Sequence, residues 1–269
     1  MSDDKKAETK APDTKTPATK KADTKKAGVA ALPAGVRERL DEFTKSLQTA
    51  LGDDLVGILV HGSVVRGEYR PGESDVDVIV VLVKADFAHL EAIGNAMQLA
   101  RYSARIEAMI LIESEIAGAS DAFPLLYDEI KQRHILLAGS DSFAAVEVHD
   151  THRRLRIEQE LREAQIRLRR AVTDAFGARE AIAGAVVRKI KQVRAPLHAL
   201  LALKDIECAP DLPSVVAKVG ETYGVDVAPL RAAREAPDAA HGTLVTLLTK
   251  AIDDVNAMEN VPSGGAIRT

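Results

Sequence analysis

The sequence predicts an α+β domain followed by an all-helical domain, and two observations carry this prediction. Between Leu32 and about Val146, apolar residues at helical spacing alternate with short apolar runs that are typical of buried strands. After His149 these short runs stop, and only long segments with helical periodicity remain. The chain has 269 residues, 46% of them hydrophobic, so both parts can bury a core.

The first part is predicted to begin with a helix at 34–51, because Val36, Leu40, Phe43 and Leu47 recur every three or four residues. Further along this part the pattern predicts strands at 55–60, 75–83 and 106–112, a helix at 87–100, and a short helix leading into a strand over 127–137. The second part is predicted to hold helices at 152–176, 178–206, 212–222 and 241–258, with a kink in the second of them at Pro196.

Composition sets the predicted boundaries. Residues 1–31 form a tail of Ala, Lys, Thr, Asp and Pro that cannot bury enough apolar surface to fold, so we expect it to be disordered. The expected units after it are an α+β domain at 32–146, a helical domain at 147–260 and a flexible C-terminus at 261–269.

The charge distribution and the lack of targeting signals argue against several classes of protein. The first 27 residues hold eight lysines against five acids, whereas the chain as a whole has a net charge of −4. The remainder is therefore too acidic for a general nucleic-acid coat, and nucleic acid is an expected partner only through the basic tail. No apolar run is long enough to span a membrane, no secretory signal is evident, and a single cysteine excludes an internal disulfide, so we expect a cytoplasmic protein.

Three acidic residues carry the expected chemistry. Asp75 and Asp77 are two residues apart on a predicted strand, so both carboxylates project from the same face. Two carboxylates this close repel each other unless a cation lies between them, and Mg²⁺ prefers such oxygen ligands. Glu107 lies in an otherwise apolar strand and must face solvent or a site. If its strand neighbours that of Asp77, Glu107 is placed to hold a second metal ion or to accept a proton.

A turn that suits a phosphate group lies between the first two strands. Gly62 ends a buried strand, and glycine allows backbone N–H groups to approach an anion closely. Ser63 adds a hydroxyl donor, and Arg66 follows one helical turn later. A phosphate-binding turn next to a pair of metal-binding acids indicates phosphoryl or nucleotidyl transfer.

These motifs resemble those of the DNA polymerase β-like nucleotidyltransferase superfamily, in particular the minimal nucleotidyltransferases and the aminoglycoside adenylyltransferases. The resemblance rests on Gly62-Ser63-x-x-Arg66-Gly67-Glu68 and on Ser74-Asp75-x-Asp77, and it covers roughly residues 55–142. It implies a small mixed sheet, a nucleoside triphosphate (ATP by expectation) and two Mg²⁺ ions held by Asp75, Asp77 and Glu107. It also implies that Gly62, Ser63, Arg66 and Ser74 bind the nucleotide.

The expected reaction is therefore transfer of a nucleoside monophosphate to a hydroxyl group, with release of pyrophosphate. The acceptor stays open at this stage. A cationic small molecule would need an acidic pocket, which Glu113, Glu115, Asp121, Asp128 and Glu129 could supply. A protein or RNA acceptor, as in toxin–antitoxin modification, would suit the helical domain and the basic tail. The alternative to an enzyme is a catalytically silent module that binds a nucleotide or a partner.

Overall fold

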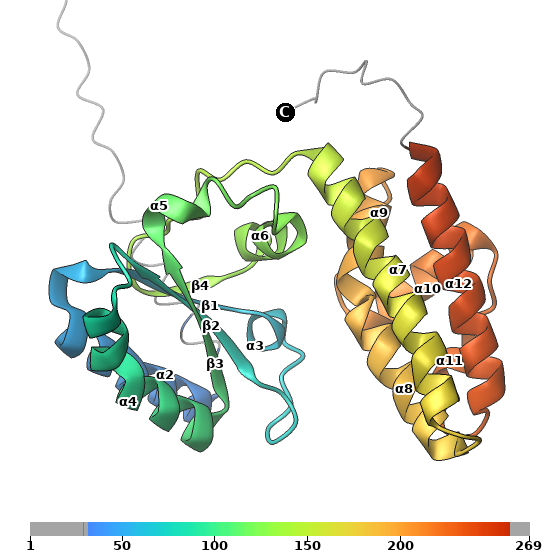
Figure 1. Cartoon of the computed structure of the whole chain (residues 1–269), viewed down its shortest axis with the longest axis horizontal. Coiled ribbons are helices and arrows are strands. Elements are labelled where there is room, and N and C mark those ends of the chain that lie inside the picture. The colour runs from blue at the N-terminus through green and yellow to red at the C-terminus, as the bar shows by residue number, and fades with distance from the viewer. Residues whose placement is uncertain (1–28, 30–31, 259–269) are drawn as a thin grey trace, which may run out of the picture.

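The computed structural model describes Val29 and residues 32–258. Apart from Val29, the predicted tail at 1–31 lies outside the described residues, and so does the predicted flexible end at 261–269. The described chain forms a sheet half (residues 32–146) and a helical half (residues 147–258), which lie side by side (Figure 1).

The sheet half is built on a four-stranded mixed sheet. Its strands are β1 (Leu55–His61), β2 (Val76–Leu82), β3 (Ile106–Ile112) and β4 (Ile135–Gly139), in the spatial order β3-β2-β1-β4. β1 pairs antiparallel with both β2 and β4, whereas β2 and β3 run parallel. This arrangement confirms the predicted α+β class and the small mixed sheet.

Helices cover both faces of this sheet. The long helices α2 (Ala34–Leu51) and α4 (Phe87–Ala104) pack on the face to which Val76, Val78 and Val80 point. The short helices α5 (Glu113–Ile116) and α6 (Pro124–Gln132) pack on the opposite face, where Tyr127 and Phe143 form an edge-to-face contact. Because side chains alternate along a strand, the polar residues of β2 and the second group of helices share one face.

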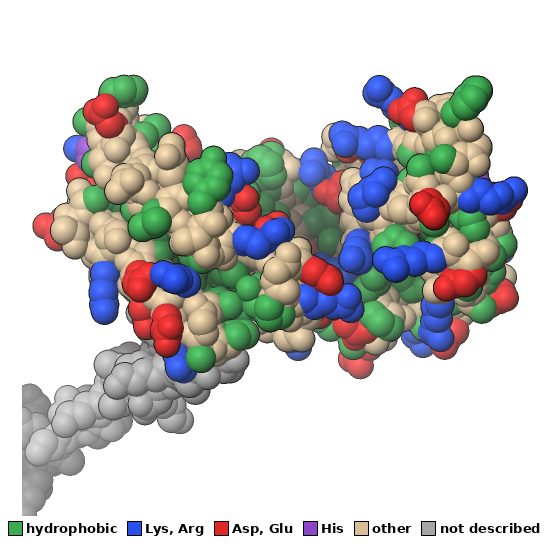
Figure 2. Space-filling view, turned by 90° about the horizontal axis from the view of Figure 1, so that it is seen from below, with side chains coloured by type: hydrophobic (Ala, Val, Ile, Leu, Met, Phe, Trp, Pro, Cys, Tyr) green, Lys and Arg blue, Asp and Glu red, His purple; other side chains and the backbone are tan. Residues whose placement is uncertain are grey.

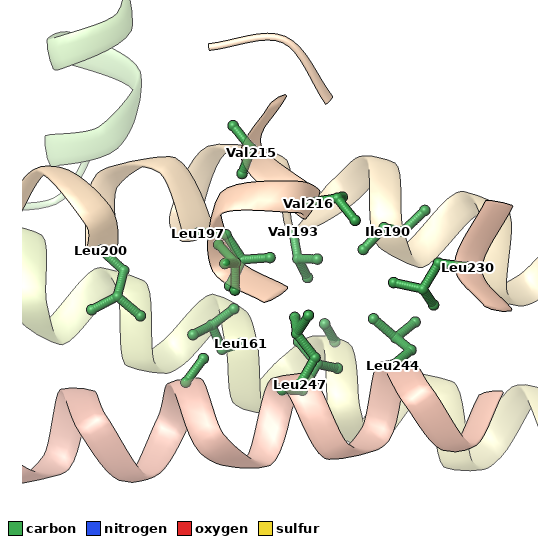
Figure 3. Close-up of a cluster of buried hydrophobic side chains, with 14 of the residues drawn as sticks. Leu161, Ile190, Val193, Leu197, Leu200, Val215, Val216, Leu230, Leu244 and Leu247 are labelled. Carbon is green, nitrogen blue, oxygen red and sulfur yellow. The ribbon is translucent and has the colours of Figure 1, made fainter. Parts of the chain in front are cut away.

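The helical half has its own apolar core. Its helices are α7 (Asp150–Asp174), α8 (Arg179–Gln192), α9 (Arg194–Leu203), α10 (Leu212–Tyr223), α11 (Ala228–Arg231) and α12 (Pro237–Ala257). Leucine, isoleucine and valine side chains from these helices meet in a buried cluster (Figure 3). Leu125 of α6 also joins this cluster, so α6 contributes to the cores of both halves.

The prediction for residues 178–206 is wrong in one respect. We expected one helix with a kink at Pro196, but the chain breaks at Val193 and α9 begins at Arg194. Pro196 is the third residue of α9, where a missing backbone N–H is tolerated because first-turn N–H groups have no helical partner. The proline therefore lies in the start of a new helix instead of interrupting an old one.

A hollow separates the two halves on the face shown in Figure 2, and Lys and Arg side chains are prominent on the helical side of that view. Within residues 32–258, no helix is long and apolar enough to cross a membrane.

Candidate active site

The turn after β1 is fixed by close contact with an acidic side chain. Gly62 has φ 74° and ψ −150°, and the short helix α3 (Ser63–Arg66) follows it directly. A Cβ atom on Gly62 would lie 2.1 Å from Oδ2 of Asp77, which is far inside van der Waals contact. Only glycine therefore allows the backbone of this turn to lie against the Asp77 carboxylate.

The sheet register brings the predicted acids together. Asp77 is the direct partner of His61 on β1 and of Glu107 on β3, so these three side chains leave the same face of the sheet. Asp75 lies one residue before β2 begins. Asp77 and Glu107 are thus neighbours on two adjacent strands, Asp75 lies just before β2, and Asp77 also contacts the Gly62 turn.

The environment of Asp77 disfavours its charged form. Burial is the largest cause, and the nearby Glu129 and Asp75 add to it, so the pKa of Asp77 is raised to about 6. Arg66 acts in the opposite direction, without reversing the shift. Asp77 is therefore a crowded, half-buried carboxylate that gains from the approach of a cation.

The other two acids are paired with arginines. Asp75 accepts from Arg105 at 2.8 Å, and Glu107 lies 3.2 Å from Arg101. The side chains of both acids are 46% exposed, so these ion pairs are weak and can open. Among the described residues, no three His, Cys, Asp or Glu side chains stand close enough to hold a metal ion. The chemistry of three carboxylates on adjacent strands nevertheless suits a hard divalent cation once the arginines move away.

The remaining predicted residues flank the turn. Ser63 is half-buried at the start of α3. The Ser74 hydroxyl accepts a hydrogen bond from the backbone N–H of Arg70 at 3.1 Å and so closes the loop before Asp75. Arg66 forms ion pairs with Glu68 and Glu129, and its side chain is only 13% exposed.

Two residues near the site, His61 and Arg194, were not predicted to belong to it, and Glu129 was predicted only as part of an acidic acceptor pocket. His61 is 9% exposed, its Nδ1 atom has no hydrogen-bond partner among the described residues, and its pKa is lowered, mainly by burial. Glu129 of α6 lies between Arg66 and Arg194, the first residue of α9. The strand register could have pointed to His61, but no local pattern marks Glu129 or Arg194.

A cavity of about 400 Å³ lies next to these residues, between α6, α7 and α9. Arg66 and Glu129 line it from the sheet half, and Arg153, Arg194 and His198 line it from the helical half. The polar end of this cavity is thus the place where the two halves meet beside the Gly62 turn.

Comparisons with known proteins agree with this geometry. A family model for a nucleotidyltransferase domain matches residues 40–137, a range that includes every predicted site residue. No curated protein sequence matches the chain.

Among solved structures, the chain is similar to spectinomycin adenyltransferase AAD(9) from Enterococcus faecialis, determined with ATP and spectinomycin. The TM-score is 0.50 at 13% sequence identity, and the match covers 81% of this chain and 98% of that one. At this identity the likeness concerns the fold, and it extends beyond the sheet half into the helices. Residues 40–137 therefore match a nucleotidyltransferase domain, and the fold of a larger part of the chain is similar to that of an adenyltransferase.

Proposed function

We propose that this protein transfers a nucleoside monophosphate from ATP to a hydroxyl group of a small-molecule acceptor, with Mg²⁺ as the metal and pyrophosphate as the second product. The observation that carries this proposal is the row of carboxylates formed by Asp75, Asp77 and Glu107 next to the Gly62 turn. The family's domain supports nucleotide transfer in general, and the similar adenyltransferase was determined with both ATP and a small-molecule acceptor.

The carboxylates would hold the metal, as one or two ions. When bound, Mg²⁺ would neutralise charge on the triphosphate and polarise the reacting phosphate. The crowding that raises the pKa of Asp77 supports this role, because a cation would relieve the repulsion from Asp75 and Glu129.

The chain's own residues would orient the nucleotide. Gly62 lets the backbone approach the β- and γ-phosphates, and Ser63 would donate to them from its amide and hydroxyl groups. Arg66 lies one turn beyond, and Ser74 borders the site from the loop that leads into Asp75. Such positioning accounts for much of the rate enhancement in phosphoryl-type transfer.

In this proposal Glu107 would act as the base. It would accept the proton of the acceptor hydroxyl while that oxygen attacks the α-phosphorus. The bond from the α-phosphorus to the bridging oxygen then breaks, and pyrophosphate leaves. Glu107 is nearly half exposed at the edge strand β3, so an acceptor can reach it from solvent.

The net negative charge of the sheet half favours an acceptor that carries positive charge. Not all five acids that the sequence suggested for the acceptor pocket are available to bind it. Asp128 is paired with Arg153, and Glu129 is paired with Arg66 and Arg194, so neither offers a free charge. Glu113, Glu115 and Asp121 are exposed in or near α5 and remain candidates for attracting a cationic acceptor.

The test is transfer of label from α-³²P-labelled ATP, and in parallel from the other three nucleotides, to panels of hydroxylated small molecules, RNA and cell proteins. The double variant Asp75→Ala/Asp77→Ala should abolish transfer. Asp53→Asn removes an exposed acid at the far end of β1 and should leave transfer unchanged.

Label on a small molecule, lost in the double variant, is the expected result. Label on RNA or protein alone would replace the proposed acceptor with a macromolecule. A folded wild-type protein that binds nucleotide and labels nothing would overturn the proposal in favour of a silent binding module.

A further inference from the structure

One short helix holds the two halves together. On α6, Tyr127 and Ile130 are buried against the sheet, whereas Leu125 belongs to the core of the helical half. The next two residues along this bridging helix after Tyr127 are the acids Asp128 and Glu129, and each is paired with an arginine of the helical half.

These two neighbouring acids differ in what else they contact. Asp128 accepts two hydrogen bonds from Arg153, at 2.6 and 2.8 Å, and Arg153 is paired in addition with Asp150. Glu129 lies 3.7 Å from Arg194 and forms a second ion pair, with Arg66 of the helix that follows the Gly62 turn. Glu129 thus connects the candidate active site with the helical half, and Asp128 does not.

Among the ion pairs of the described residues, Glu129 contacts both arginines, and Glu68 contacts Arg66. The side chains of Arg66 and Arg194 are each 13% exposed, so their charges are poorly screened by water. The pKa of Arg194 is lowered by burial first and by the nearby Arg66 second, which shows that the two guanidinium groups repel each other. Arg194 is also anchored by a hydrogen bond to the carbonyl of Pro210 at 2.8 Å.

We propose that Glu129 is a positioning residue, whose carboxylate holds Arg66 of the sheet half and Arg194 of the helical half together beside the phosphate-binding turn. The inference rests on the proposed nucleotidyl transfer. Without this carboxylate, the two cations would move apart, and the helical half would lose its charged contact with the site.

The role has a characteristic kinetic consequence. A negative charge beside the turn does not itself attract a triphosphate, so removing it should not weaken nucleotide binding. What should be lost is the orientation of the arginines during the reaction, and loss of orientation lowers kcat. Replacing a residue that merely stabilised the fold would instead lower the melting temperature, and it would not lower kcat while leaving nucleotide binding unchanged.

The test compares the steady-state kinetics of Glu129→Gln and Asp128→Asn with those of the wild-type protein. The substrate is the acceptor found in the labelling assay. Asp128→Asn is the control, because it removes the neighbouring ion pair between the two halves. In Glu129→Gln, kcat should fall about tenfold while KM for the nucleotide stays equal or falls. In Asp128→Asn, both constants should stay within about twofold even though the melting temperature drops. Glu129→Asp, which keeps the charge, should recover part of kcat.

A wild-type kcat in Glu129→Gln, or an equal loss of kcat in Asp128→Asn, would overturn the proposal. A second measurement does not depend on activity: the Nε–Hε NMR signals of Arg66 and Arg194 should both shift in Glu129→Gln and neither should shift in Asp128→Asn. If the wild-type protein transfers no nucleotide, the proposed function fails, and these signals still decide whether Glu129 joins the two arginines. Signals that stay unmoved in Glu129→Gln would overturn that role.

Discussion

The sheet half and the helical half balance their charges in different ways. Residues 32–146 hold eighteen Asp and Glu against ten Lys and Arg, a net charge of −8, whereas residues 147–258 hold sixteen against seventeen, a net charge of +1. Along α7 of the helical half, acids and arginines form ion pairs one turn apart, as in Arg156–Glu160 and Arg167–Glu163. These arginines of α7 thus belong to an ion-paired helix face.

The sheet half instead holds an excess of acid, and the effect of neighbouring acids is seen at Asp77. Asp77 is half-buried beside other acids, and its raised pKa records the cost of that crowding. A charged carboxylate that is crowded by other acids lowers the free energy of unfolding, and a bound cation would relieve this cost at Asp77. We therefore expect the proposed transfer to depend on the crowded acids around Asp77 more than on the balanced charge of α7.

The largest effect is expected from Gly62→Ala. The new Cβ would overlap the Asp77 carboxylate, so the turn must shift, and we expect nucleotide transfer to fall about 100-fold. Gly67→Ala is the matched control, because Gly67 also has a positive φ (80°) but no atom lies within 4 Å of its added Cβ. That control should lose about 1–3 kcal/mol of stability through backbone strain and keep most activity. Equal activities of the two variants would contradict the close contact at Gly62.

Cavities in the two cores should separate stability from activity. Leu247→Ala, in the fully buried core of the helical half, should reduce the free energy of unfolding by about 2–5 kcal/mol, measured by chemical denaturation. Its kcat should stay within about twofold at a temperature where the variant is folded. Ile79→Ala, two residues from Asp77 on the same face of β2, should lose stability and also lower kcat about tenfold. Unchanged kcat in Ile79→Ala would mean that the strand tolerates the cavity without moving Asp77.

Protonation of Asp77 makes stability depend on pH. Its pKa is raised from 3.8 in the unfolded chain to about 6, so the folded state holds this proton more tightly. The contribution of Asp77 to stability is therefore greatest below about pH 4 and is lost as the pH rises through about 6. Denaturation without metal should show Asp77→Asn gaining stability relative to wild type over this interval. Added Mg²⁺ should remove the gain, and a pH-independent difference between the two proteins would contradict the crowded environment.

The smallest effect is expected on the ion-paired face of α7. Replacing Arg156 by Ala removes one pair with Glu160 and should cost about 0.3–0.5 kcal/mol of stability at low salt. Thermal unfolding at low and high salt measures this, and the difference from wild type should shrink as salt screens the pair. A loss of nucleotide transfer in this variant would show that α7 reaches the site and is more than a structural face.

Local patterns predicted most elements because their apolar spacing is strong. The helix at 34–51 and the strand at 106–112 have the predicted bounds, since each repeats its apolar residues over the whole element. The prediction around Pro196 failed because a proline within a helix and a proline in the first turn of a new helix follow similar local patterns. The boundary between α8 and α9 at Val193 has no clear local signal in the sequence, and Val193 is fully buried in the core of the helical half.

The sequence by itself determined the chemistry that each local motif offers. Gly62 and Ser63 follow each other in the chain, Asp75 and Asp77 share a strand face, and such short-range relations follow from backbone geometry alone. Only the tertiary structure decided which motifs meet. It placed Glu107 beside Asp77 through the pairing of β2 with β3, and it brought Glu129 to Arg66, 63 residues earlier in the chain, and to Arg194 of the helical half. Ion pairs between distant segments depend on how two cores pack around a shared helix, and no local pattern encodes that packing.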